Sequence, residues 1–315
     1  MPSIGERFFL DFPRPLRSTA TERESMSPAS TTQQRKELSK GEQHALVSLL
    51  ADEDPAIYRT VREKILSYGP PAAEWLKPHI MSDDPALRRR ARQIVLHFER
   101  QASDDHFLAF CIRHGEEFDL ELGAWLFAQT QYPLINVEAY QALLESYAHE
   151  LRDRLATTVE PRKVLTTINQ YLFNELGFAG NEENYYDPQN SYLNRVIDRR
   201  TGNPINLCLL YILLARRLRL PLAGIGLPGH FICRFQSTAA EIYLDPFNHG
   251  RFLTKADCVQ YLTNANFSLR DEYLAPVSPR RLLLRICSNL HQVYQRLELA
   301  VEAMRLQRYL VALAR

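Results

Sequence analysis

Three residues whose side chains can carry out acyl chemistry follow one another in the second half of the chain: Cys208, His230 and Asp245. A deprotonated thiol is a nucleophile, an imidazole can hold the thiolate as an ion pair, and a carboxylate can orient the imidazole. Such a set can cleave or transfer an acyl group. These three residues are therefore the candidates for catalysis.

Cys208 lies in a stretch, residues 203–220, that predicts a buried helix. Pro204 suits the first helical position, and Asn203 can cap the free backbone donors before it. Apolar residues then recur at helical spacing, namely Ile205, Leu207, Leu210, Tyr211, Leu214 and Leu218.

His230 and Asp245 lie next to short apolar runs that predict strands, at residues 222–225, 231–235 and 241–244. Pro228 and Gly229 force a turn just before His230. We expect an antiparallel sheet on which Asp245 hydrogen bonds to His230. The pair could serve catalysis or could be retained for packing, and Asp245 could also simply begin a turn, since Pro246 follows it.

Several phrases carry a family resemblance: residues 184–194, 202–205, 215–221, 227–231 and 245–247. Together they resemble the SirB-type family of transglutaminase-like proteins, and the resemblance covers roughly residue 107 to the end. It implies a bacterial protein with an α+β, mainly helical fold, a transglutaminase-like (papain-type) core and tetratricopeptide-type helices at the C-terminus. Because this fold hosts peptidases, transferases and inactive relatives, the resemblance does not fix an activity.

The same resemblance implies a role for each catalytic candidate. In active relatives a cysteine opens the core helix, a histidine lies on the following strand, and an aspartate on the next strand orients it. His230 and Asp245 match the last two positions, but the cysteine position falls near Pro204. Cys208 lies one turn deeper, about 6 Å along the helix axis. A thiol among leucines tends to stay protonated, so a small buried apolar residue is the favoured interpretation of Cys208 and a nucleophile is the alternative.

Residues 184–194 are rich in amide and phenol side chains, with three asparagines and three tyrosines. Such groups could line a cleft, but buried amides and phenols more often satisfy backbone groups and buttress a core. If the protein has a ligand, Asn190, Tyr192 and Asn206 are the candidate binding residues.

Composition restricts the class of protein. The chain has 315 residues, 45% hydrophobic and 24% charged, with a formal net charge of +1, which argues against a generic nucleic-acid or membrane-surface role. No apolar stretch is long enough to span a membrane, and the N-terminus lacks a secretory profile, so we expect a cytoplasmic protein. Five widely spaced cysteines, Cys111, Cys208, Cys233, Cys258 and Cys287, predict reduced thiols, with no metal site and no cofactor.

We predict five segments. Residues 1–38 are expected to be disordered, and translation could start at Met26 rather than Met1. Residues 39–104 contain an internal repeat, since the phrase at 52–57 recurs at 82–87, and are predicted to form HEAT-like helices that end near Leu66 and Leu96. The arginine run at 88–90 is expected to be a solvated helix face. Residues 105–176 form a helical bridge, 177–275 the transglutaminase-like core, and 276–315 a tetratricopeptide-like hairpin that must dock on the core or accept a partner helix.

Two functions remain open. The first is a non-catalytic scaffold or regulatory protein that binds a protein or peptide partner. The second is a cysteine-nucleophile peptidase, amidase or acyl-transferase that uses Cys208, His230 and Asp245.

Overall fold

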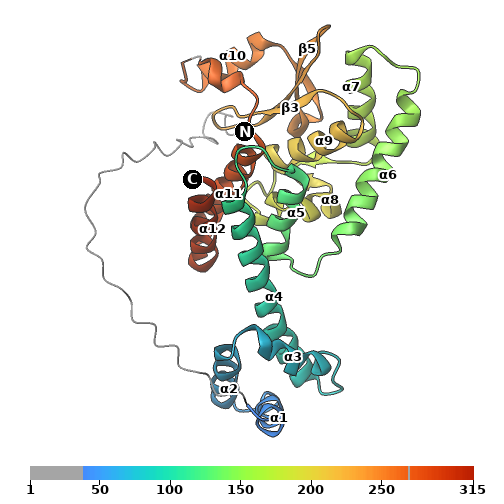
Figure 1. Cartoon of the computed structure of the whole chain (residues 1–315). Helices are drawn as coiled ribbons and strands as arrows, with labels where there is room; N and C mark the ends of the chain where they lie inside the picture. The colour runs from blue at the N-terminus through green and yellow to red at the C-terminus, as the bar shows by residue number, and fades with distance from the viewer. Residues whose placement is uncertain (1–37, 269) are drawn as a thin grey trace. The chain divides into compact units, whose positions relative to one another are not determined.

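The computed structural model describes residues 38–268 and 270–315, which form two compact units (Figure 1). The smaller unit ends at Ala102 and the larger unit runs from Ser103 to Arg315. The predicted disorder before residue 38 and the alternative start at Met26 lie outside the described residues.

The smaller unit is helical. It contains α1 (Lys40–Leu49), α2 (Pro55–Ser67), α3 (Ala73–Leu76) between the 3-10 turns Pro70–Ala72 and Lys77–His79, and the first part of α4 (Pro85–Arg113). Ser39 caps α1 through a capping box, and Asp54 caps α2. The helices enclose a small apolar core, namely Val47, Leu50, Val61, Ile65, Ala72, Ala73, Leu76, Ala91, Ile94 and Phe98.

Two expectations for this region are wrong. The helix that was expected to end near Leu96 runs on to Arg113 as α4, which has 29 residues in all, because no glycine or proline interrupts it before Gly115. Arg90 is not simply solvated either: its guanidinium donates to the carbonyl oxygens of Leu50 and Asp52 at 2.6 Å each. It thereby satisfies carbonyls that the end of α1 leaves without a helical partner.

The larger unit places a four-stranded sheet against helices. The helices after α4 are α5 (Leu120–Gln131), α6 (Val137–Leu155), α7 (Pro161–Asn169), the π-helical turn Gln170–Glu175, α8 (Leu193–Arg199), α9 (Pro204–Arg217), α10 (Lys255–Asn264), α11 (Pro279–Arg296) and α12 (Ala300–Leu313). In Figure 1, α6 and α7 lie on one side of this unit, and α11 and α12 on the other.

The sheet is antiparallel throughout, with strands β3 (Leu222–Ile225), β4 (Ile232–Gln236), β5 (Glu241–Asp245) and β6 (Arg251–Leu253) in that order. The three predicted strands are therefore confirmed, whereas β6 was not predicted. A separate parallel pair, β1 (Ala179–Gly180) with β2 (Thr201–Gly202), leads into the start of α9. Strands of two or three residues are too short to show alternating hydrophobicity.

Helix α9 is the centre of the core, because every residue from Pro204 to Ala215 is buried. It packs against α6, α8, α11 and the strands β3 and β4. A helix that is apolar on all sides has to be surrounded in this way. A second, smaller cluster joins the sheet to α10 through residues such as Ile225, Ile232, Cys258 and Leu262.

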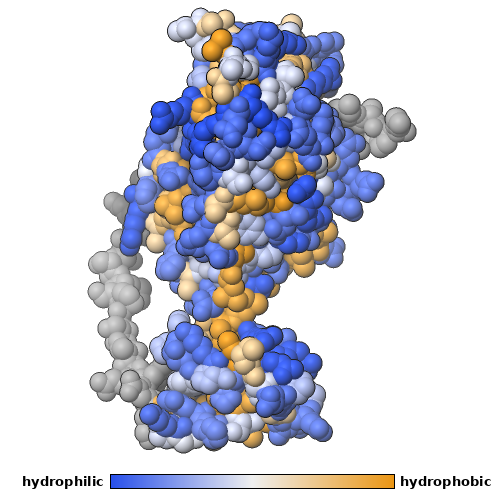
Figure 2. All heavy atoms as spheres, turned by 90° about the vertical axis from the view of Figure 1, so that its right-hand side faces the viewer, coloured by the Kyte–Doolittle hydropathy of each residue, from blue (hydrophilic) through white to orange (hydrophobic). Residues whose placement is uncertain are grey.

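The C-terminal hairpin of α11 and α12 docks on this core, as expected. Helix α11 buries Leu283, Ile286 and Leu290, and α12 buries Leu306 and Tyr309. In the described part of the chain, no helix is both long and apolar enough to cross a membrane. Over the face that carries α6 and α7, Figure 2 shows mostly hydrophilic residues, with hydrophobic ones in small groups.

Candidate functional site

His230 and Asp245 meet at one end of the sheet. His230 follows the turn between β3 and β4, where Gly229 adopts a positive φ of 74°, and Asp245 ends β5. The Nε2 atom of His230 lies 2.8 Å from Oδ2 of Asp245. The predicted hydrogen bond is therefore confirmed, and both side chains are largely buried, at 12% and 7% exposure.

Asp245 also begins a turn. Its Oδ1 accepts from the backbone N–H of Phe247 at 3.1 Å and of Asn248 at 3.4 Å, and its Oδ2 accepts from Nδ2 of Asn248 at 2.7 Å. Burial tends to raise the pKa of Asp245, but attraction to His230 and these hydrogen bonds outweigh burial and lower it. The carboxylate of Asp245 thus has two roles: it orients the imidazole of His230, and it caps the turn that begins at Asp245.

A partly buried arginine holds the turn that carries His230. Arg285 of α11 donates through Nη2 to the carbonyl oxygens of Leu227, at 2.5 Å, and His230, at 2.9 Å. Burial lowers the pKa of Arg285 to about 10. Sequence reasoning missed this residue, although a charged side chain between Leu283 and Ile286 on the buried side of a predicted helix was a usable signal.

Cys208 is sealed in the core. Its side chain is 0% exposed, and its Sγ donates to the carbonyl oxygen of Phe231 at 3.4 Å. Burial, reinforced by the neighbouring Cys233, raises the pKa of the Cys208 thiol well above its usual value. The thiol is therefore protonated at neutral pH.

The start of α9, where the resemblance places a cysteine, is filled by a network of amides. The Oδ1 of Asn203 accepts from the backbone N–H and from Nδ2 of Asn206, both at 3.0 Å. The Nδ2 of Asn203 donates to Oγ of Ser191 at 3.1 Å. Pro204 occupies the first helical position, so the first turn offers no nucleophile.

The other two predicted binding residues are also buried, at 1% exposure each. Asn190 donates through Nδ2 to the carbonyl oxygens of Asn184 and Tyr185 and accepts from Nδ2 of Asn181. The hydroxyl of Tyr192 lies 3.0 Å from that of Tyr294 on α11. Asn190 and Asn206 thus stabilise the loop before α9, and Tyr192 faces the C-terminal hairpin.

Among the described residues, no three His, Cys, Asp or Glu side chains converge as a metal-ligand set. All five cysteines are free and buried.

Comparison with known proteins finds similarity over the residues that carry this site. Residues 138–288, which contain α9, the sheet and the His230–Asp245 pair, match the model of the transglutaminase-like superfamily. Residues 138–288 of this chain are thus similar to transglutaminase-like proteins.

Curated relatives extend the match. A UPF0162 protein of Xylella fastidiosa is 40% identical over 189 residues, which is 57% of this chain and 66% of that protein, just under two thirds. A UPF0162 protein of Pseudomonas aeruginosa is 28% identical over 190 residues, covering 58% of this chain and 67% of that protein. F-box only protein 21 of Mus musculus is 35% identical over 140 residues, which is 41% of this chain and 21% of the mouse protein. No solved structure matches the chain significantly.

Proposed function

We propose that the protein is a non-catalytic transglutaminase-like scaffold or regulatory protein that binds a protein or peptide partner. The burial of Cys208 carries this proposal. Its sulfur is 0% exposed and donates to the Phe231 carbonyl, and the raised pKa keeps the thiol protonated. An acyl-transfer nucleophile has to be ionised and reachable by substrate, and Cys208 is neither.

The start of α9 supports the same function. The amide network of Asn203, Asn206 and Ser191 occupies the first turn, where a nucleophile would gain from the helix dipole. The preserved His230–Asp245 pair then serves to fix the turns at the end of the sheet. The match to F-box only protein 21 covers about a fifth of that much longer protein. A domain of this kind can therefore be one module among others in a larger protein.

The finer assignments belong to the same proposal. The chain is a SirB-type protein in which α11 and α12 form one tetratricopeptide-like hairpin, and α1 to α4 form a HEAT-like unit. Its net charge of +1 and the absence of a membrane-spanning helix from the described residues favour a cytoplasmic protein that binds neither nucleic acid nor membranes.

A second candidate is an enzyme that uses Cys208, His230 and Asp245. One observation favours it: the imidazole and the carboxylate lie at 2.8 Å, which is the arrangement that orients a general base. This enzyme would require a movement that brings the Cys208 sulfur out of the core and ionises it.

Alkylation of Cys208 by iodoacetamide distinguishes the two. Native protein and His230→Ala are labelled between pH 6 and pH 9, and each cysteine is quantified by peptide mass spectrometry. We expect Cys208 to react no faster than Cys233 and Cys258, because burial protects all three and raises the pKa of Cys258 to about 11. Labelling in denaturant provides the reference rate for each thiol.

Fast labelling of Cys208 near pH 6 that disappears in His230→Ala would reveal a thiolate paired with His230. That result would replace the scaffold proposal with the enzyme, and amide and thioester substrates would then be screened.

A further inference from the structure

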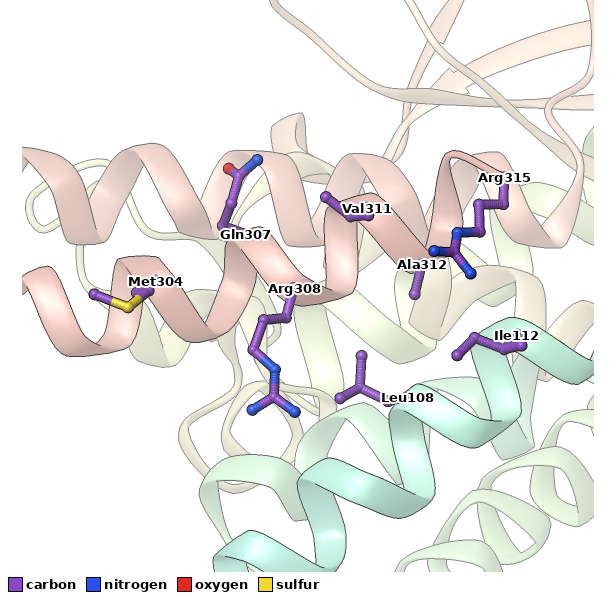
Figure 3. A pocket seen from close by; sticks show the side chains of 8 residues that line it. All are labelled: Leu108, Ile112, Met304, Gln307, Arg308, Val311, Ala312 and Arg315. Carbon is purple, nitrogen blue, oxygen red and sulfur yellow. The ribbon is translucent and has the colours of Figure 1, made fainter. Parts of the chain in front are cut away.

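An open groove lies between the last part of α4 and α12, both in the larger unit. Its lining is mostly apolar, and its volume is about 370 Å³. Figure 3 shows Leu108 and Ile112 on α4 facing Ala312 of α12, with Arg308 reaching toward α4. Ile112 is 58% exposed, so an apolar side chain at the rim remains in water.

On the outer side of α12, residues recur at the spacing that is typical of a coiled-coil seam. Val301, Met304, Arg308, Val311 and Arg315 follow one another at intervals of three and four residues. Val301, Met304 and Val311 are 77%, 68% and 51% exposed. Residues at this spacing form one stripe along a helix, and such a stripe packs against a second helix.

The groove carries charge of one sign only. Arg308 and Arg315 line it, no acidic residue does, and neither arginine forms a hydrogen bond or ion pair with another described residue. Elsewhere in the larger unit arginines at helix surfaces are paired, for example Arg154 with Glu150 and Glu175. Asp104 of α4 attracts Arg308 but forms no ion pair with it. The exposed apolar side chains thus lie beside two cations that a complementary acidic surface can pair.

We infer that this groove binds an amphipathic helix of a partner protein, with an apolar seam and two carboxylates seven residues apart. The carboxylates pair with Arg308 on α12 and with Arg315, which lies seven residues after Arg308 and two residues beyond the end of that helix. The seam covers Met304, Val311 and Ile112. This inference rests on the proposed function and specifies the site and chemistry of the partner.

Two other occupants fit less well. A second copy of the chain would bring two lining surfaces of the same positive charge together, with no acidic residue in either lining to offset the repulsion. A bilayer would have to reach Leu108 and Ala312, which lie between two helices, whereas membrane-binding helices present a convex apolar face.

Photo-crosslinking in the cells that produce the protein tests the inference. The full chain carries p-benzoylphenylalanine in place of Met304, and the crosslinked peptides are identified by mass spectrometry. We expect crosslinks to a helix-forming segment of another protein that has apolar residues at heptad spacing and acidic residues seven apart. Arg308→Glu combined with Arg315→Glu should lower the crosslink yield about ten-fold, because it replaces attraction by repulsion.

Two controls make the result decisive. Arg281→Glu changes the charge of an exposed arginine on α11 that does not line the groove, and it should leave the yield unchanged. Val159→p-benzoylphenylalanine places the probe at another exposed apolar residue, 94% exposed and outside the groove.

Crosslinks from Met304 to a second copy, to lipid, to this chain itself or to a segment without acidic residues would overturn the inference. Protein crosslinks from position 159 alone would overturn it too, yet leave the proposed function standing. An absence of protein crosslinks from position 304 would also overturn the inference. Turnover of an amide or thioester beside that absence would remove the proposed function as well.

Discussion

The surroundings of His230 and the outer side of α12 both contain charged side chains. The two regions differ in whether those side chains find hydrogen-bond or ion-pair partners within the chain. Around His230, Asp245 accepts four hydrogen bonds and Arg285 donates to two carbonyl oxygens. On α12, Met304 and Val311 are exposed and Arg308 forms neither a hydrogen bond nor an ion pair with the described residues. The polar groups of the first region are satisfied within the described chain, whereas the second leaves apolar side chains in water and, in our proposal, receives a partner there.

The difference distinguishes polar residues that stabilise the fold from polar residues that are available to bind another molecule. Arg280 and Arg308, which belong to the same hairpin, are an example of each kind. Arg280 is 6% exposed and donates to the carbonyl oxygens of Leu313, Ala312, Cys111 and His114, at the C-terminal ends of α12 and α4. A cation there offsets the negative ends of two helices.

The largest expected effect comes from Arg280→Leu, because this substitution removes the donor from four carbonyl oxygens, three of which take part in buried hydrogen bonds. We expect the free energy of unfolding to fall by about 3–5 kcal/mol. Arg308→Leu should change it by less than about 0.5 kcal/mol. Urea denaturation followed by circular dichroism measures both. Equal losses would mean that Arg308 is as deeply involved in the fold as Arg280, and the contrast between the two regions would fail.

Asp245→Asn should have the next largest effect. The amide keeps the shape but removes a charge that accepts four hydrogen bonds, so we expect a loss of about 2 kcal/mol at pH 7. The folded pKa of Asp245 is lowered, so its carboxylate contributes stability that is present above the unfolded pKa of about 4. That contribution is lost as the pH falls through the folded pKa.

Denaturation of wild type and Asp245→Asn from pH 7 down to pH 3 measures this linkage. The two stabilities should converge below about pH 4. A constant difference over the whole range would show that Asp245 acts through packing rather than through its charge.

Much of the fold was predictable from the sequence, because a long apolar pattern is compatible with only one or two kinds of secondary structure. The helix from Asn203, the three strands and the His230–Asp245 contact followed from periodicity and from turn residues. Strands β1, β2 and β6 did not, since two or three residues carry no period. The full length of α4 was not predicted. The phrase that begins α4 repeats the phrase that begins α2, and the two helices were therefore expected to have the same length.

The site was only partly predictable. The sequence showed that Cys208 lies about one turn beyond the expected cysteine position, but it could not show that the sulfur donates to the carbonyl oxygen of Phe231. It also gave no means to distinguish arginines that bind backbone carbonyls where helices end, such as Arg280 and Arg90, from arginines in solvent. That distinction depends on which helix ends come together in three dimensions, and local patterns do not record it.

Cys208→Ala should have a smaller effect. It removes one sulfur and a weak hydrogen bond from a packed core, so we expect a loss of about 1 kcal/mol. We also expect unchanged binding to any partner captured through α12, because the core site and the outer face act independently in this scheme. Thermal unfolding measures the first quantity, and the crosslinking yield from position 304 measures the second. A large fall in yield with an intact fold would connect the two regions.

The smallest effect on stability is expected for the double substitution of Met304→Gln and Val311→Gln. Both side chains face water in the free chain, so the free energy of unfolding should stay within about 0.5 kcal/mol of wild type. Leu306→Ala, on the buried side of the same helix, is the matched control and should cost about 2–5 kcal/mol. If the glutamine pair proved as costly as the alanine, the outer side of α12 would already be covered in the free protein, and a partner helix would have no surface left to bind.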